Sequence, residues 1–388
     1  SDPSWEGHWN FMRILHFYKT YYPDTMGGTE QFINQLARST LDLGVQTDVL
    51  ALSTNCLNTP TVHLQGHRIH RVPRTFQIAS TGVGFSAFSR FAQLAEKADL
   101  IHYHFPWPFM DVVHFATKIK KPTVVTYHSD IIRQKRLLNI YRPLRNQFLS
   151  SVDKIVATSN NYIETSTALN RFKEKTVAIP IGLDKSTYPK PSEQLLNKWK
   201  EQVGPRFFLF VGMLRYYKGL HVLLAALQGT DLPMVIVGSG PNEIELKQQA
   251  ERLNLKNIHF LGALSDIDKV ALLTLCTAMV FPSHLRSEAF GISLLEGAMY
   301  GKPLISCEIG TGTSFVNRHR VTGFVVEPEN PQALRQAMRF LWENKAEAEI
   351  LGQQAEKHYW EHFTAKQMAA SYVGLYKELF EAKSGVFI

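Results

Sequence analysis

Short apolar runs alternate with segments of helical periodicity along this sequence, and the alternation occurs twice. The inner strands of a parallel sheet read as continuous apolar runs, and crossover helices return the chain between them. The pattern predicts two doubly wound α/β domains, because 388 residues exceed what one hydrophobic core usually holds. We expect strands at 12–17, 47–52, 100–104, 122–128, 154–159 and 176–181, and again at 207–212, 232–238, 257–262, 277–282 and 303–308.

A polar stretch with two prolines interrupts the alternation and places the domain boundary within residues 184–205. Beyond Pro331 the periodicity is wholly helical. Ligands of open α/β sheets bind outside the carboxyl ends of the strands. With two such domains, the cleft between them is the expected binding site.

Composition excludes several classes of protein. Hydrophobic residues make up 45% and charged residues 20%, which indicates packed cores rather than a disordered or fibrous chain. The longest nearly uncharged apolar stretch, residues 270–283, has 14 residues, whereas a membrane-spanning helix needs about 20. The three cysteines are widely spaced, which indicates neither a disulfide framework nor a zinc site and favours a reducing, cytoplasmic compartment. The first ten residues contain no apolar signal core.

The net charge of +8 is concentrated in the first half of the chain. Residues 1–185 contain 21 Lys and Arg against 14 acidic residues, and residues 186–388 contain 21 against 20. One segment mixes apolar residues with five cations and no acid: Arg133, Lys135, Arg136, Arg142 and Arg145. It is either a solvated helix face or a surface for anionic membrane or lipid phosphate. Nucleic acid is disfavoured, since no stacking motif or zinc finger accompanies the charge.

The segment 281–308 carries the most informative pattern. A strand ends near Phe281, and the apolar spacing from Gly291 onward predicts a helix. Free amides at the start of a helix bind anions, as a diphosphate requires. Glu288 and Glu296 lie too far apart along the chain to reach one atom, so we expect separate roles, one at a sugar and one at the rest of a nucleotide. The alternative is that both carboxylates face solvent.

Further candidates follow other predicted strands. Arg215 and Lys218 precede a helical leucine stripe and would neutralise a leaving diphosphate, unless they are unrelated surface cations. Gly27 and Gly28 follow the first strand, where they permit either close approach of a substrate or simply a tight turn. His128 ends a strand on the side of the expected cleft, and a purely structural histidine is the alternative.

Other chemistries are disfavoured by what accompanies these residues. His102 and His104 alternate on a strand, but no nearby carboxylate or cysteine completes a metal site, so we expect metal-free chemistry. The sequence has no GxSxG elbow, P-loop or kinase-type loop, which disfavours serine hydrolases and phosphoryl-transfer enzymes.

SEAFGISLLE, at residues 287–296, resembles the signature segment of retaining glycosyltransferases of family 4, which have the GT-B fold. MGGTE, TYHSD, IPIGLD and VGMLRYYKG occur in the order typical of that family, so the resemblance covers nearly the whole chain. RILHFYKTYYPDTMGGTEQ and LRYYKGLHVLL more narrowly resemble bacterial mannosyl- and rhamnosyltransferases of O-antigen or other surface polysaccharide. One departure concerns the arginine that many members place directly after the strand glycine, where this chain has Met213 and offers Arg215 instead.

The resemblance implies two Rossmann-like domains that face a central cleft. Residues 1–185 would form the acceptor-binding domain, joined by a returning C-terminal helix within residues 364–388, and residues 186–363 would bind the nucleotide-sugar. Glu296 would bind the ribose, the backbone near Leu264 the base, and Glu288 the donor sugar. The implied catalytic residues are His128, Glu288, Arg215 and Lys218, and the implied donor-binding residues are Gly27, Gly28, Arg215, Lys218, Leu264, Phe290, Gly291, Ile292, Ser293 and Glu296.

The implied reaction is retaining transfer of a hexose, of the mannose or rhamnose type, from a nucleotide diphosphate-sugar to a glycan or lipid-linked acceptor. A GDP-sugar is the favoured donor, and neither a metal nor another cofactor is required. The acceptor hydroxyl would attack on the front face with the leaving phosphate as base, since no positioned carboxylate nucleophile is evident.

Two alternatives remain open at this point. A sugar-nucleotide epimerase of the same fold would need its own acid/base carboxylates. A non-enzymatic basic adaptor, bound to membrane or nucleic acid, would leave the two anion sites unexplained. The charge excess places the acceptor site in the first domain, and a lipid diphosphate at the inner face of the cytoplasmic membrane would account for the cations at 133–145.

Overall fold

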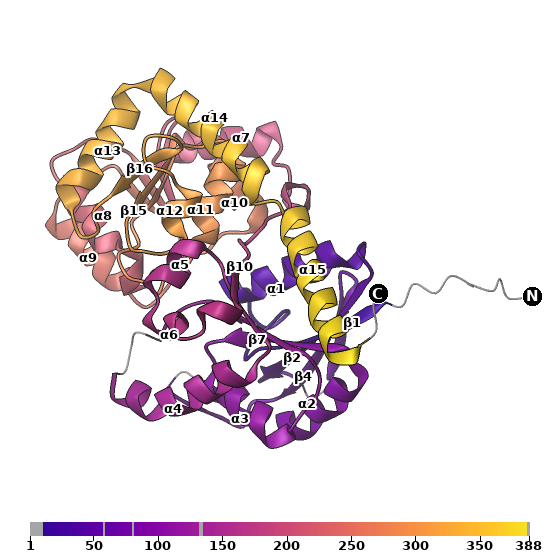
Figure 1. Cartoon of the computed structure of the whole chain (residues 1–388). Helices are drawn as coiled ribbons and strands as arrows, with labels where there is room; N and C mark the ends of the chain where they lie inside the picture. Colours follow the sequence, from indigo (N-terminus) through magenta and orange to yellow (C-terminus); the bar gives the residue numbers. More distant parts are fainter. Residues whose placement is uncertain (1–10, 57–58, 80, 132–134, 386–388) are drawn as a thin grey trace, which may run out of the picture. The chain divides into compact units, whose positions relative to one another are not determined.

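The computed structural model describes residues 11–56, 59–79, 81–131 and 135–385, and its chain divides into two compact units (Figure 1). The first unit contains Ser1–Thr158, Ser166–Gly182 and Ala365–Ile388, and the second contains Ser159–Thr165 and Leu183–Thr364. The chain therefore passes from one unit to the other after Thr158, Thr165, Gly182 and Thr364, whereas the sequence predicts one domain of residues 1–185 and a second of residues 186–363.

An eight-stranded sheet forms the centre of the first unit. All neighbouring strands in it are parallel except the edge pair β3 and β4. In spatial order the strands are β10 (Thr176–Ala178), β9 (Lys154–Ala157), β8 (Thr123–Tyr127), β7 (Leu100–Phe105), β1 (Met12–Phe17), β2 (Val45–Ser53), β4 (His67–Pro73) and β3 (Thr61–Leu64). A separate antiparallel hairpin joins β5 (Phe76–Ile78) to β6 (Thr81–Val83).

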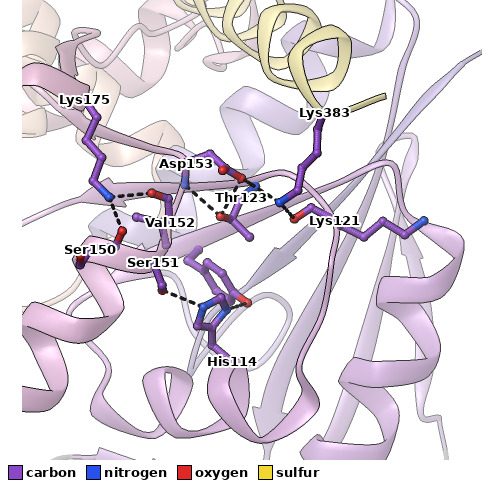
Figure 2. Close-up of polar contacts among 10 residues, drawn as sticks. His114, Lys121, Thr123, Ser150, Ser151, Val152, Asp153, Lys175 and Lys383 are labelled. Atoms are coloured by element: carbon purple, nitrogen blue, oxygen red, sulfur yellow. Dashed lines mark hydrogen bonds and ion pairs between the residues drawn. The ribbon is translucent and has the colours of Figure 1, made fainter. Parts of the chain in front are cut away.

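Helices cover this sheet. They are α1 (Gly28–Leu41), α2 (Ser86–Lys97), α3 (Pro108–Thr117), α4 (Lys135–Ser151), α6 (Thr167–Asn170) and α15 (Ala365–Ser384). The last helix belongs to this unit because its aromatic face packs on strand residues: the Tyr376 hydroxyl lies 2.6 Å from Nδ1 of buried His102. Figure 2 shows Lys383 donating to the carbonyl of Lys121 at 3.2 Å and to Asp153 at 3.4 Å.

The carboxyl end of α4 is held by a lysine from the next part of the chain. Lys175 donates to the carbonyls of Ser150 at 2.8 Å and Val152 at 2.7 Å (Figure 2). These carbonyls lack helical partners, so a cation there both satisfies them and complements the helix dipole.

The second unit is built on six parallel strands. In spatial order they are β13 (Ile258–Phe260), β12 (Met234–Val237), β11 (Phe208–Val211), β14 (Ala278–Phe281), β15 (Leu304–Cys307) and β16 (Gly323–Val326). The helices are α5 (Asn160–Thr165), α7 (Glu193–Val203), α8 (Leu220–Leu227), α9 (Glu243–Arg252), α10 (Asp266–Leu275), α11 (Ile292–Met299), α12 (Thr313–Val316), α13 (Pro331–Glu343) and α14 (Lys345–His362). Leucines of α8 pack with β11, β12 and α13 in one buried cluster.

The predicted fold class is confirmed: each unit is a doubly wound α/β structure, and every strand expected from an apolar run is present. No apolar run predicts β4, because this strand carries buried polar residues. Their charges are paired: His70 and Arg68 contact Asp48 on β2 at 2.7 and 2.9 Å. Strand β16 (Gly323–Val326) was not predicted either.

Among the described helices, none is both long and apolar enough to cross a membrane. The three cysteines are buried and unpaired.

Candidate functional site

The predicted site residues divide between the two units. Gly27, Gly28 and His128 belong to the first unit, and all the others belong to the second. In both units they follow the carboxyl ends of parallel strands, either in the next loop or, like Glu296, in the next helix, as expected for an open α/β sheet.

In the second unit, the loop after β11 carries Arg215 and Lys218 and ends at Gly219. Gly219 has φ of +73°, and a Cβ on it would lie 2.0 Å from the carbonyl oxygen of Pro282. Only glycine meets both conditions, so this residue allows the β11 loop to contact the loop after β14. The backbone amide of His284 completes the contact by donating to the Tyr217 carbonyl at 3.0 Å.

The loop after β14 ends in the predicted helix, α11. Its N-cap, Gly291, has φ of +92°, and a Cβ there would lie 3.2 Å from the Phe281 ring. No side chain caps this end of the helix. The first amides of α11, at Ile292 and Ser293, therefore retain their capacity to bind an anion.

Lys218 and Glu288 form an ion pair between these two loops, and each side chain is 12% exposed. Ser283 also donates to the Glu288 carboxylate, at 3.3 Å. Burial is the largest single influence on the pKa of Lys218 and would lower it, but the Glu288 carboxylate and the Tyr217 hydroxyl together outweigh burial and raise that pKa above its usual value. Lys218 is therefore a fixed positive charge at neutral pH, and two of the predicted catalytic residues lie side by side.

Arg215 and Leu264 also lie at the edge of the sheet where the strands end. The Arg215 side chain is exposed, next to the half-buried Lys218 on the same loop. Leu264 is half-buried in the loop between β13 and α10. Phe290 is buried, and its ring lies 5.8 Å from that of Phe363.

Glu296 lies within α11 and makes a contact that the sequence did not indicate. Its carboxylate accepts a hydrogen bond from the Tyr188 hydroxyl. Burial raises the pKa of Glu296, although this hydrogen bond opposes the shift. Glu288 and Glu296 thus have different partners, Lys218 and Tyr188. Tyr188 had no sequence signal because it lies in the polar segment interpreted as a domain boundary.

A third loop, after β15, also contacts this region and was missed. The Gly312 amide donates to the Ala289 carbonyl at 2.7 Å, and a Cβ on Gly312 would lie 2.7 Å from the Phe290 ring. Arg286 donates to the Gly310 carbonyl at 3.0 Å. These bonds fix the loop that carries Glu288, and they depend on contacts between segments that no local motif reveals.

In the first unit, Gly27 and Gly28 lie at the start of α1. The turn before them is held by the buried carboxylate of Glu30, which accepts from the hydroxyls of Thr20 at 2.8 Å and Thr25 at 2.7 Å. The predicted glycine turn is therefore fixed before any ligand arrives.

His128 follows β8, and its backbone amide donates to the Phe105 carbonyl at 3.0 Å. Its ring is half-buried, with Nε2 at 3.0 Å from Nδ1 of His104 and the edge-on ring of Phe32 at 5.2 Å. Burial lowers the pKa of His128 to about 3. At neutral pH this side chain is an uncharged hydrogen-bonding group rather than a cation or a proton donor of acid type.

Comparison with protein families identifies both halves of the chain. Residues 26–187 match the family described as Glycosyltransferase Family 4, and residues 191–358 match Glycosyl transferases group 1. D-rhamnosyltransferase WbpZ of Pseudomonas aeruginosa is 60% identical over 354 residues, 91% of this chain and 93% of its own length. O-antigen chain mannosyltransferase C of Escherichia coli is 49% identical and covers 96% of this chain and 100% of its own length.

Solved structures match the fold across both units. Sucrose-phosphate synthase from Thermosynechococcus elongatus has a TM-score of 0.78 at 19% identity and covers 96% of this chain and 100% of its own. The Anabaena protein Alr3699/HepE, solved in complex with UDP, has a TM-score of 0.73 at 20% identity and covers 94% and 99%. At such identities the likeness establishes the GT-B fold alone.

Buried histidines in the first unit predict a loss of stability in mild acid. Burial lowers the pKa values of both His16 and His128 to about 3, against 6.5 for a free side chain. As the pH falls, the two histidines of the unfolded chain are protonated before those of the folded chain. Their contribution to the free energy of unfolding is therefore fully present above pH 6.5 and is lost as the pH falls from 6.5 towards 3. The expected slope is about 1.4 kcal/mol per pH unit for each histidine.

Urea denaturation of the protein at pH 8, 6 and 5 measures this slope. His16→Phe is expected to be less sensitive to pH than the parent, whereas His63→Phe, at an exposed position, is expected to keep the parent slope. Equal stability of the parent at pH 8 and 5 would contradict the prediction.

Proposed function

The chain belongs to the family 4 (group 1) glycosyltransferases, and we propose that it transfers a mannose- or rhamnose-type hexose from a GDP-sugar to a growing surface polysaccharide. In this proposal the transfer retains the configuration of the donor sugar. The similarity of the protein to O-antigen mannosyl- and rhamnosyltransferases over more than nine-tenths of the chain supports the substrate class. Neither a sugar-nucleotide epimerase nor a basic adaptor gains any support from these relatives.

The observation that carries the chemistry is the placement of Lys218 and Glu288 together beside the open end of α11. A sugar diphosphate needs positive charge and amide donors at its phosphates, and a carboxylate to accept hydrogen bonds from its hydroxyls. In the proposal, Lys218, Arg215 and the first amides of α11 hold the diphosphate, and Glu288 binds the sugar. Glu296 binds the ribose, and the backbone near Leu264 meets the base.

The proposed reaction proceeds on one face of the sugar. As the bond between the anomeric carbon and the diphosphate breaks, the acceptor oxygen forms its new bond on the same face, and a phosphate oxygen takes the acceptor proton. The leaving group departs as the nucleoside diphosphate. Lys218 stabilises the charge that develops on it, and positioning supplies much of the remaining rate.

His128 would bind the transferred sugar as a neutral partner. Because burial lowers its pKa to about 3, His128 would form a directional hydrogen bond to the sugar without placing a charge beside it. The Gly27–Gly28 turn would provide backbone groups for the same ligand.

Transfer without a metal is the direct test of this function. We mix the protein with a GDP-linked hexose, a lipid-linked acceptor and excess EDTA. The expected product has the anomeric configuration of the donor, which NMR detects. UDP- and dTDP-sugars are the comparison donors. Loss of transfer in EDTA that manganese or magnesium restores would contradict metal independence, and an inverted product would contradict retention.

Lys218→Ala is expected to weaken binding of GDP by about 1.5–3 kcal/mol, because it removes a charged hydrogen bond and leaves Glu288 without its cation. Isothermal calorimetry with GDP measures the change. Lys247→Ala is the matched control, since Lys247 lies in the same unit and is paired with Glu243 on an exposed helix face. Equal GDP affinities for the two variants would remove Lys218 from the donor site.

The acceptor is proposed to be a glycan on a lipid diphosphate at the inner face of the cytoplasmic membrane. The basic segment forms the amphipathic helix α4, and the structure exposes Lys135, Arg136 and Arg142 on it. Leu137 and Ile140 are also exposed, by 47% and 78%. Exposed apolar side chains among cations are typical of a helix that lies in an anionic membrane surface. Arg133, also expected there, lies outside the described residues.

Salt-sensitive membrane binding follows from this surface. Each cation near an anionic bilayer contributes about 1 kcal/mol, so changing Lys135, Arg136 and Arg142 together to Ala is expected to abolish cosedimentation with anionic vesicles at low salt. A control variant with Lys198, Lys200 and Lys247 changed to Ala loses the same charge from exposed helix faces of the second unit. If the two variants bind equally, or if the parent does not bind, α4 is only a solvated helix face and the membrane proposal is wrong.

A further inference from the structure

Four histidines gather at the carboxyl end of the first sheet. His16 lies on β1 directly opposite His102 on the parallel strand β7. His104 lies two residues further along β7, on the same face of the sheet, and His128 follows the neighbouring strand β8. The first three are fully buried.

Hydrogen bonds connect three of these rings in a row. Nδ1 of His16 lies 2.9 Å from Nε2 of His104, and Nδ1 of His104 lies 3.0 Å from Nε2 of His128. The ring planes are nearly parallel, at 17° and 23°, with centroids 5.2 Å apart at both contacts. His104 therefore uses both of its nitrogens to join His16 to His128.

The ring of His102 stacks on those of His16 and His104 but does not belong to this hydrogen-bonded row. Its Nδ1 lies 2.6 Å from the Tyr376 hydroxyl and its Nε2 lies 2.7 Å from the Thr126 hydroxyl. The ring stacks on His104 at 4.6 Å without a hydrogen bond to it in the described network. His102 thus shares the burial and the stacking of the row, but its hydrogen bonds run to α15 and β8.

The cluster has the composition of a metal site, since ligand nitrogens of His16, His102 and His104 lie within 4.8 Å of one another. The orientation of the rings opposes that use. The ring of His102 makes angles of only 29° with His16 and 13° with His104. Imidazole lone pairs lie in the ring plane, so those of stacked rings do not converge on one ion.

We propose that His16 and His104 are positioning residues that fix the tautomer and orientation of His128, leaving its Nδ1 as the atom that meets the transferred sugar. The assignment of the sugar as the ligand of His128 rests on the proposed function. The chain of hydrogen bonds itself does not, because it is complete within the first unit.

The tautomers of the three rings are tied together. Each N···N hydrogen bond needs one N–H and one lone pair, and a neutral imidazole has one of each. If His16 carries its proton on Nδ1, His104 and then His128 must do the same, and Nδ1 of His128 donates to the sugar. If His128 carries its proton on Nε2, so must the other two, and Nδ1 of His128 accepts. A mixed arrangement would set two lone pairs or two protons against each other.

Nitrogen NMR of the unliganded protein, with histidines labelled with ¹⁵N, measures this directly. His16, His104 and His128 are expected to share one tautomer, assigned by comparison with single His→Phe variants. Different tautomers among the three would overturn the chain. So would binding of added zinc to His16, His102 and His104 in the parent, which would identify a metal centre instead.

Kinetics test the link to function with two isosteric variants. His104→Phe keeps the buried stack but cuts both hydrogen bonds to its neighbours, and is expected to lower kcat/KM about tenfold, the upper range for one lost hydrogen bond, with GDP affinity unchanged. His102→Phe, equally buried, is the matched control and is expected to retain the parent kcat/KM. Equal activity of the two variants would overturn the positioning role.

The His128→Ala variant separates this inference from the proposed function. If it transfers sugar as well as the parent, the assignment of His128 to the sugar fails, while the tautomer measurement still decides whether the chain exists. If His128→Ala is impaired but His104→Phe is not, the proposed function stands and the positioning role falls. Should His104→Phe not fold, His16→Phe, which cuts only the first hydrogen bond, replaces it.

Discussion

All strands of the second sheet run in one direction, and this constraint sets where the chemistry of the unit can lie. Loops that follow β11, β14 and β15 leave from a single edge, so they must pack against one another. Glycines make that contact possible: Gly219 admits the Pro282 carbonyl where any side chain would collide with it. Only because the backbones approach so closely can Lys218 and Glu288 meet in a pair that is almost removed from solvent.

The two units present different kinds of polar group at these edges. The second unit offers an ion pair that is almost removed from solvent and free helix amides, which suit a ligand with several negative charges. The first offers His128, held neutral by burial, and a glycine turn fixed by Glu30. Neutral donors and acceptors distinguish hydroxyl groups by the direction of the hydrogen bonds they form, whereas charges would mainly attract phosphates. Each unit taken by itself therefore offers a different chemistry, charge in the second and neutral hydrogen-bonding groups in the first.

The sequence predicted those parts of the fold and site that local pattern determines. Apolar runs located the strands, and the loop motifs placed the candidate residues Lys218, Glu288 and His128 after strands, where the structure has them. Prediction failed where a polar group is satisfied by a distant partner. The charges of β4 are neutralised by Asp48, and Tyr188 bonds to Glu296 more than a hundred residues away. Such pairs leave no periodic signal, because only the folded chain brings them together.

Histidine illustrates this limit most clearly. On the sequence, His102 and His104 were two residues on a strand with no carboxylate or cysteine to make them a metal site. In the fold they differ, because His104 faces His16 and His128 while His102 is bonded to Tyr376 from the last helix. Alternation along a strand predicts which face a side chain occupies, but its neighbours on that face come from other strands.

The return of α15 to the first unit covers one member of the histidine group directly. Tyr372 and Tyr376 of this helix lie over Thr126 and His102, the latter fully buried. Histidines in contact with water titrate near pH 6.5, and a protonated ring has no lone pair with which to accept. A row of N–H···N hydrogen bonds persists only where every ring keeps one lone pair. Within the described residues, the last helix reaches this row only through its neighbours: Tyr376 bonds to His102, and Tyr372 lies near Phe32, whose ring is edge-on to His104 and His128.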